Sequence, residues 1–171
     1  MKIKYLLISQ PQPVDIEKTP YKDLIHKHKV HIDFNKFFKI EGIETRDFRQ
    51  FRINILDYTA IIFNSKNAID HFFRIAKEMR IVIPEQMKYF CTTEQTAYYL
   101  QNYIQFRKRK IFFASHNIDN LIQLIKKHKN EKFLIPCSDI QNPELYNTLK
   151  NNQIHITKAI FYKTACNDLT H

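Results

Sequence analysis

The chain has 171 residues, of which 44% are hydrophobic, and a net charge of +10; this length fits one domain, or one domain with part of another. No apolar run approaches the roughly 18 residues of a membrane-spanning helix and the start lacks a signal-peptide pattern, so we expect a cytoplasmic protein without membrane contact. The three cysteines are too widely spaced for a disulfide framework or a metal site, and the single glycine, Gly42, excludes the glycine-rich loops that bind dinucleotides and nucleoside triphosphates.

The excess of positive charge has two explanations. It favours an anionic partner such as nucleic acid, a phosphate or a polycarboxylate. It also accompanies an abundance of Lys, Ile and Asn, which is expected from an AT-rich genome. Composition leaves both explanations open.

The first part of the chain predicts a βαβ unit. An apolar segment at 3–9 predicts a strand, Pro20 opens a short helix over 21–28, and alternating side chains predict a second strand over 30–34. Residues 37–40 continue extended toward Gly42 and are interpreted as a connector.

From Thr45 onward, predicted helices and strands alternate regularly. The expected helices are 46–56, 66–79, 94–102, 117–128 and 143–151, and the expected strands are 59–63, 88–91, 111–114, 133–136 and 154–162. This alternation predicts an α/β fold with a parallel five-stranded sheet and helices on both faces, in flavodoxin-like order. In the first helix we expect Phe48, Phe51 and Ile55 to face inward.

Polar turns follow four of the predicted strands. They contain Ser, Thr, Asn or Asp and lie at 64–67, 92–96, 115–117 and 137–139. Because the carboxyl ends of parallel strands meet at one edge of the sheet, these turns would form an edge rich in helix N-termini that accepts anions. The alternative is that these residues only cap helices, which needs no ligand.

The order of these segments resembles the uroporphyrinogen-III synthase family. YTAIIFNSKNA at 58–68 is similar to the family's T-S-x-n-A segment, and TEQTAYYL at 93–100 to its T-A-x-x-L helix start. FLIPCSD at 133–139 is similar to its p-r-g/s-d turn, and AIFYKT at 159–164 to its V-Y-R-T strand. The opening Ser9-Gln10-Pro11 and FRQFRINILD at 48–57 resemble the Bacteroidetes branch in particular.

This resemblance implies an enzyme of haem and tetrapyrrole biosynthesis. Such enzymes cyclise the linear tetrapyrrole hydroxymethylbilane to uroporphyrinogen III, with loss of water and inversion of the last pyrrole ring. The family fold has two flavodoxin-like lobes joined by a pair of strands, with the active site between the lobes. The resemblance implies no metal and no cofactor, and a substrate that carries many carboxylates.

The resemblance also implies the site residues. Tyr162 matches a polar residue of the family cleft, and we expect it to assist departure of the hydroxyl as a hydrogen-bond donor or weak acid; its alternative is a packed strand tyrosine. We expect the following residues to bind the substrate carboxylates: Asn64, Ser65, Lys66, Thr93, Thr96, Ser138 and Lys163. Asn64 replaces the usual Thr, Lys163 replaces the usual Arg, and the glycine before the Thr-Ala helix is replaced around Thr92.

Relative to the family pattern, the chain is short. We expect residues 1–36 to be a partial lobe one, 37–43 a connector, 44–158 a complete flavodoxin-like lobe two, and 159–171 a return connector after which lobe one stops. The chain then holds half of the cleft, either because the gene product is truncated or because a partner supplies the rest. An unpaired strand edge in the partial lobe would favour a homo-oligomer.

Other segments have simpler interpretations. The basic cluster at 107–110 fits a solvated turn better than a nucleic-acid patch, so no nucleic acid is expected. His26, His28 and His31 lack a supporting cysteine or carboxylate cluster, so no metal site is predicted. His116 either contacts a substrate carboxylate or caps a helix. The rival function is a non-enzymatic flavodoxin-like module that binds an anionic ligand or nucleic acid.

Overall fold

A computed structural model describes residues 3–105, 107, 109–114, 118–140 and 143–167. The chain divides into two compact units. We call Met1–Ile40 with Thr164–His171 the terminal unit, and Glu41–Lys163 the main unit. Among the described residues, no helix is long and apolar enough to cross a membrane.

The terminal unit contains the predicted βαβ. Its elements are β1 (Tyr5–Ile8), the 3₁₀ helix η1 (Ile16–Lys18), α1 (Tyr21–His26) and β2 (His31–Phe34). β1 and β2 pair in parallel, with Tyr5 opposite His31. The Tyr21 ring of α1 packs edge-on against Phe34, with the centroids 5.3 Å apart, so α1 covers one face of this pair.

The opposite face of the β1–β2 pair is open. Tyr5 and Leu7 are 73% and 60% exposed, and Val30 is the one buried hydrophobic residue in the described part of this unit. Parallel sheets normally have both faces covered. The terminal unit is therefore half of a layered structure.

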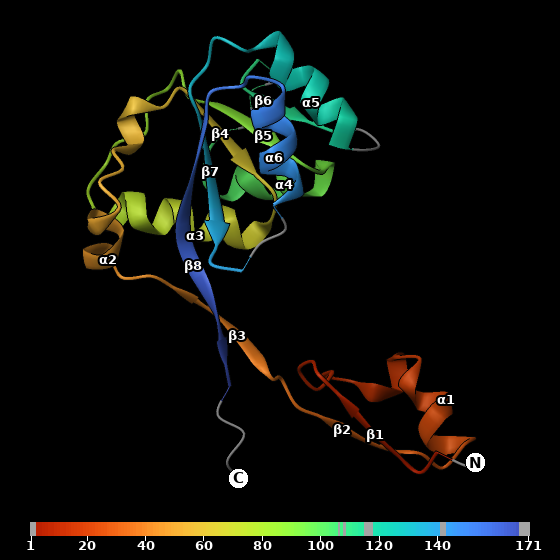
Figure 1. The fold of residues 1–171 in the computed structure, drawn as a ribbon. Coiled ribbons are helices and arrows are strands. Elements are labelled where there is room, and N and C mark those ends of the chain that lie inside the picture. Colours follow the sequence, from red (N-terminus) through yellow and green to blue (C-terminus); the bar gives the residue numbers. More distant parts are fainter. Residues whose placement is uncertain (1–2, 106, 108, 115–117, 141–142, 168–171) are drawn as a thin grey trace. The chain divides into compact units, whose positions relative to one another are not determined.

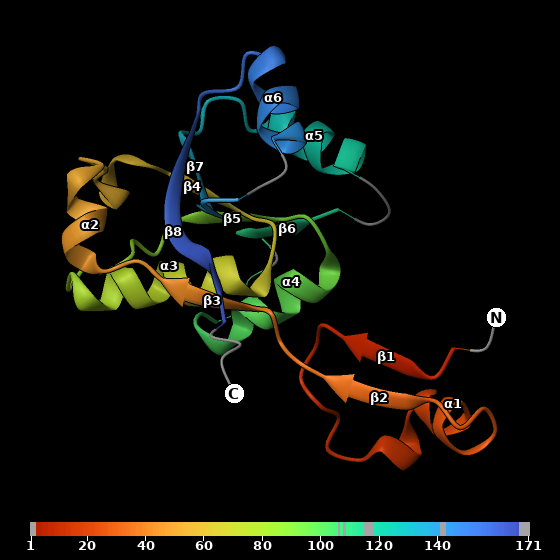
Figure 2. The same cartoon turned by 60° about the horizontal axis from the view of Figure 1, so that its bottom comes forward.

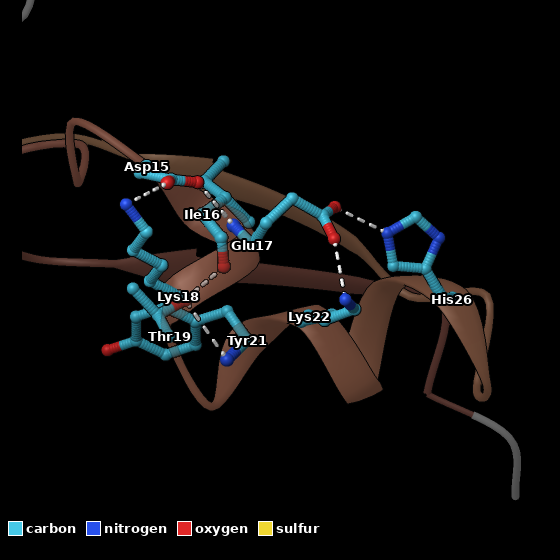
Figure 3. A network of polar contacts seen from close by, with 8 residues as sticks. All are labelled: Asp15, Ile16, Glu17, Lys18, Thr19, Tyr21, Lys22 and His26. Atoms are coloured by element: carbon cyan, nitrogen blue, oxygen red, sulfur yellow. Dashed lines mark hydrogen bonds and ion pairs between the residues drawn. The ribbon is translucent and has the colours of Figure 1, made fainter.

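A polar network joins η1 to α1 on the surface (Figure 3). The Glu17 carboxylate accepts a hydrogen bond from His26 Nε2 at 2.8 Å and pairs with Lys22 Nζ at 2.9 Å. His26 and then Lys22, as hydrogen-bond donors, lower the pKa of Glu17. His31 Nε2 lies 3.1 Å from Asp33, so these two histidines each contact a single carboxylate. Within the described residues, no group of three such side chains is arranged to hold a metal ion.

The main unit is built around a six-stranded sheet with the order β3-β8-β7-β4-β5-β6. Its strands are β3 (Phe38–Gly42), β4 (Ala60–Phe63), β5 (Lys88–Cys91), β6 (Ile111–Phe113), β7 (Phe133–Ser138) and β8 (Ile156–Cys166). The last five are parallel to one another. Hydrogen bonds from Ile43 N to Phe161 O and from Asn167 N to Phe37 O show that β3 runs antiparallel to β8.

The predicted parallel α/β fold is confirmed, but the strand order is not that of flavodoxin. Numbered along the chain, the five parallel strands lie in the order 3-2-1-4-5, whereas flavodoxin has 2-1-3-4-5. β4 is central: the chain proceeds outward through β5 and β6 on one side, and then through β7 and β8 on the other. The alternation of helices and strands does not show on which side of the growing sheet each new strand is placed. The strand order therefore cannot be predicted from this pattern.

Helices cover both faces of this sheet (Figures 1 and 2). α3 (Lys66–Glu78) and α4 (Glu94–Tyr99), followed by the 3₁₀ helix η3 (Leu100–Asn102), lie on one face, and α5 (Ile118–Lys127) and α6 (Glu144–Asn151) lie on the other. Alternate residues of β4 divide between the two cores: Ile61 and Phe63 pack on the α3 side, and Ala60 and Ile62 on the α5 side. The continuous apolar run of this strand follows from burial on both faces.

The predicted helix at 46–56 is wrong in its second half. α2 (Thr45–Gln50) stops early, Arg52 has a φ of 53°, and a 3₁₀ helix, η2 (Ile55–Asp57), follows. The Asn54 side chain accepts a hydrogen bond from Leu56 N and so favours a new turn over continued α-helix. Ile55 is buried as expected, but Phe51 is 44% exposed.

Residues 38–40 of the predicted connector belong to β3, and the last strand is longer than expected. β8 continues to Cys166, and both strands have residues in each of the two units. The chain thus enters and leaves the main unit through two neighbouring strands.

Several helices end near a residue that has a left-handed backbone conformation although it is not glycine. Lys29, Arg52, Arg80 and Gln153 have φ between 52° and 57°. After α3, Ile81 N donates to Ala76 O and Arg80 N to Lys77 O, which closes the end of the helix. Gly42 does not have a positive φ, so its role is different.

Candidate functional site

A cavity of about 340 Å³ opens at the carboxyl ends of the central strands. The lining residues come from the ends of β4, β5 and β7, from β8 beside the end of β7, and from the starts of α5 and α6: Asn64, Ser65, Thr92, Ile118, Ser138, Ile140, Glu144, Leu145 and Tyr162. The strand order reverses between β4 and β7, and the cavity lies beside this point. In open α/β sheets, ligands bind at this topological switch point.

Ser65 and Tyr162 meet in the cavity although 97 residues separate them. Ser65 follows β4 and caps α3, where its Oγ accepts a hydrogen bond from Ala68 N at 3.2 Å. The same Oγ lies 3.2 Å from Tyr162 Oη, and either hydroxyl can be the donor. Ser65 therefore caps α3 and contacts the phenol at the same time. Its role as a helix cap does not exclude a role in the cavity.

A β-bulge determines where Tyr162 points. Cys137 pairs with Ile160, but the next residue, Ser138, pairs with Tyr162, so Phe161 is an extra residue in β8. Phe161 and Tyr162 consequently pack into the same core, although neighbours in a regular strand face opposite sides. Tyr162 is only 6% exposed. Burial raises its pKa, an effect that the contact with Ser65 partly offsets, so the phenol stays protonated at neutral pH.

Ser138 is the second buried hydroxyl of the lining. It ends β7, donates to Asp139 Oδ1 at 2.8 Å and accepts from Ile140 N at 3.3 Å. Asn64 is exposed at the cavity, and Thr92 is half-buried. The polar part of the lining is thus formed mainly by hydroxyl and amide groups.

Thr93 and Thr96 form the cap of α4. Thr93 Oγ1 accepts from Thr96 N at 3.1 Å, and the two hydroxyls lie 2.8 Å apart. Thr96 is buried and Thr93 is exposed, and neither residue lines the cavity. The observed contacts are those of a helix cap, and a role in substrate binding stays a prediction.

The two predicted lysines also lie outside the cavity lining. Lys66 is exposed with its Nζ 5.3 Å from the centre of the Tyr99 ring, and Lys163 is exposed with its Nζ 3.9 Å from Glu41 Oε2. Among the described lining residues, Glu144 carries the one charged side chain. The net positive charge of the chain is therefore not concentrated in this part of the cavity.

Sequence reasoning found part of the lining only as a turn, or not at all. Thr92 lies in the predicted polar turn at 92–96 but is not among the predicted binding residues, although it directly follows β5 just as Asn64 follows β4. Ile118, Glu144 and Leu145 enter the lining through the packing of α5 and α6, and Ile140 follows β7; no motif marks these four residues. His116, with the rest of the turn at 115–117, lies outside the described residues.

Comparison with known proteins agrees with this geometry. The family model of uroporphyrinogen-III synthase HemD matches residues 21–170. The search of curated proteins gave no significant match. Similar solved structures include a mutant uroporphyrinogen III synthase from the extremely thermophilic bacterium Thermus thermophilus, with a TM-score of 0.63 and 10% identity over 96% of this chain. A uroporphyrinogen-III synthetase from Helicobacter pylori has a TM-score of 0.56 and 16% identity over 98% of this chain.

This chain covers 64% of the length of each of those two proteins. At such low identity, the two structures show a shared fold. The family model, in contrast, matches the sequence over most of its length and includes the turns that line the cavity. The chain therefore belongs to the uroporphyrinogen-III synthase family.

Proposed function

We propose that this chain is a uroporphyrinogen-III synthase, which converts hydroxymethylbilane to uroporphyrinogen III with loss of water and inversion of the last pyrrole ring. The observation that carries the proposal is the Ser65–Tyr162 pair. It lies in a cavity at the topological switch point of the sheet, in a chain that belongs to the synthase family. The proposal places the protein in cytoplasmic tetrapyrrole biosynthesis and involves no cofactor.

Tyr162 would act on the hydroxymethyl group of the substrate. When the C–O bond breaks, the oxygen leaves with the electron pair and takes up a proton to form water. A buried phenol with a raised pKa keeps its proton and can donate it in a hydrogen bond to the leaving oxygen, and weak acid assistance suits a leaving group that the electron-rich pyrrole already expels. Ser65 would hold this phenol, since its own oxygen is fixed by Ala68 N.

The remaining polar residues would bind the substrate. Asn64 and the N-terminus of the 13-residue helix α3 offer hydrogen-bond donors to carboxylates. Ser65 and Ser138 would donate by turning their hydroxyls away from Tyr162 and Asp139. A cavity of about 340 Å³ is near the lower end of ligand sites, so it would hold only part of a linear tetrapyrrole. Lys66, Lys163, Thr93 and Thr96 would then contact substrate carboxylates that extend beyond the cavity.

The test is to add purified chain to hydroxymethylbilane and to separate the products by isomer. Uroporphyrinogen III above the level formed without protein supports the proposal. Tyr162→Phe should lower kcat by about tenfold to a hundredfold, because it removes one donor at the reacting bond. Formation of isomer I alone, at the spontaneous rate, would refute the proposed activity for this chain. Salt-dependent binding of nucleic acid in that case would favour the non-enzymatic alternative.

We also propose that a second copy of the chain covers the open face and strand edge of the terminal unit. Tyr5 and Leu7 present exposed apolar surface on a parallel strand pair that has one covered face. Sedimentation equilibrium should detect a dimer. Leu7→Glu should shift the chain to a monomer without changing the ratio of uroporphyrinogen III to uroporphyrinogen I that it forms. A monomer at every concentration would contradict this part of the proposal.

A further inference from the structure

We propose that His71 is a positioning residue for Tyr162, a role that rests on the proposed function of the same site. The two rings are stacked, with centroids 5.2 Å apart and planes inclined by 22°. His71 lies on α3, the helix that Ser65 caps. One helix thus holds the phenol at two points, with Ser65 at its hydroxyl and His71 at its ring.

Arg74, one turn further along α3, fixes the orientation of the imidazole. Its Nε–H donates to His71 Nδ1 at 3.4 Å. Arg74 is itself held by Ile43 O at 2.7 Å and by Glu78 Oε1 at 2.8 Å, so it is anchored at both sides. The guanidinium can only donate, so Nδ1 must carry a lone pair and the proton of the neutral ring is on Nε2.

The surroundings keep this imidazole neutral. Burial and then the positive charge of Arg74 lower the pKa of His71, while Asp70 acts in the opposite direction. A cation stacked on the phenol would lower the pKa of Tyr162 and favour the phenolate, which has no proton to donate. A neutral imidazole supports the ring and leaves the phenol in the protonated form that the proposed chemistry uses.

The only glycine of the chain leaves space for this arrangement. Gly42 is in β3, and a Cβ at this position would lie 2.7 Å from His71 Nδ1 and even closer to the guanidinium of Arg74. Because Gly42 does not have a positive φ, its backbone would accept another residue. A side chain at position 42 would therefore displace Arg74 or His71 from this arrangement, and through them Gly42 bears on Tyr162.

The first test is independent of activity. Aromatic resonances of Tyr162, identified by their loss in Tyr162→Phe, should shift in His71→Ala and also in Gly42→Ala. The nitrogen spectrum of His71 should show an unprotonated Nδ1 and a protonated Nε2 at about pH 7. The control is His128→Ala, since His128 also packs on aromatic rings, those of Phe90 and Phe112, away from the cavity. Tyr162 resonances that are unchanged in His71→Ala would overturn the proposal.

The second test uses the rate. His71→Ala should lower kcat by about tenfold and leave KM nearly unchanged, because the phenol is present but poorly held. His71→Phe keeps a flat ring behind the phenol and should recover kcat to within about threefold of wild type. An equal loss in both variants, with equal loss of thermal stability, would indicate a merely structural role and refute positioning. If wild type gives only isomer I, the proposed function fails, and the Tyr162 resonances still decide the role of His71.

Discussion

The terminal and main units use the same structural element, a parallel strand pair with a crossover helix, but they bury it differently. In the main unit both faces of β4 are covered, and Ile61, Ile62 and Phe63 are all fully buried. In the terminal unit β1 alternates between exposed and half-buried residues. The difference shows that a parallel strand contributes to a core only when two layers enclose it. We therefore expect the free energy of unfolding to depend mainly on the main unit.

The largest predicted effect is in the core of the main unit. Phe90 is fully buried and its ring lies within 5.3 Å of those of Phe112 and Phe133, so Phe90→Ala should lower the free energy of unfolding by about 3–5 kcal/mol. Phe34→Ala in the half-buried β2 should cost about 1 kcal/mol. Urea unfolding followed by circular dichroism measures both values. Equal costs would show that the terminal unit has a core of its own.

Helix caps give a smaller contrast between the units. Ser65→Ala removes the cap of α3 and the contact with Tyr162, and should cost about 1–2 kcal/mol. Asp15, which caps the short η1, is half-buried, and Asp15→Ala should cost about 0.5 kcal/mol, the lower end of the range for a helix cap. Thermal unfolding of the two variants tests this order, and a reversed order would contradict it.

A gain in stability is expected from glycine at a helix end. Arg80→Gly should stabilise the protein by about 0.5–1 kcal/mol, because a left-handed φ strains any residue with a Cβ. Lys29→Gly relieves the same strain in the terminal unit. If that unit unfolds separately, this change will leave the unfolding of the main unit unaltered. Loss of stability in Arg80→Gly would show that the arginine side chain outweighs the strain.

The smallest predicted effect depends on pH. Hydrogen bonds from Thr45 and then Arg74 lower the pKa of Glu78. A depressed carboxyl pKa contributes stability above the unfolded value of 4.5, and this contribution is lost as the pH falls through the folded value. The difference between wild type and Glu78→Gln should therefore be largest near neutral pH and vanish in acid. A difference that persists at low pH would mean that packing, not charge, is responsible.

Much of the main unit is predictable because local patterns determine it. The apolar run before Asn64 and the cap at Ser65 identify a buried strand, a turn and a helix, and all three are present. The resemblance to the synthase family predicted Tyr162 as a site residue, and in the structure Tyr162 lines the cavity. Its contact with His71, in contrast, depends on packing between β8 and α3, which leaves no periodic signal in the sequence.

Other differences have equally specific causes. The helical period of the sequence continues through Phe51, because the sequence does not show that Arg52 turns left-handed. Lys66 and Lys163 are predicted site residues by motif position, and in the structure their long side chains extend to Tyr99 and Glu41 outside the cavity lining. The position of a backbone in a motif is therefore more predictable than the direction of a long side chain.

The bulge at Phe161 has a consequence for how this family member can change in evolution. The extra residue lets Phe161 and Tyr162 face the same core, and regular pairing of the same residues would turn the phenol toward the opposite face of the sheet. Deletion of the Phe161 codon would restore regular alternation and keep the phenol on its face, but the fully buried ring of Phe161 would be lost from the core. Change in this strand is therefore limited by the bulge, because it allows a core phenylalanine and a cavity tyrosine to be neighbours in the sequence.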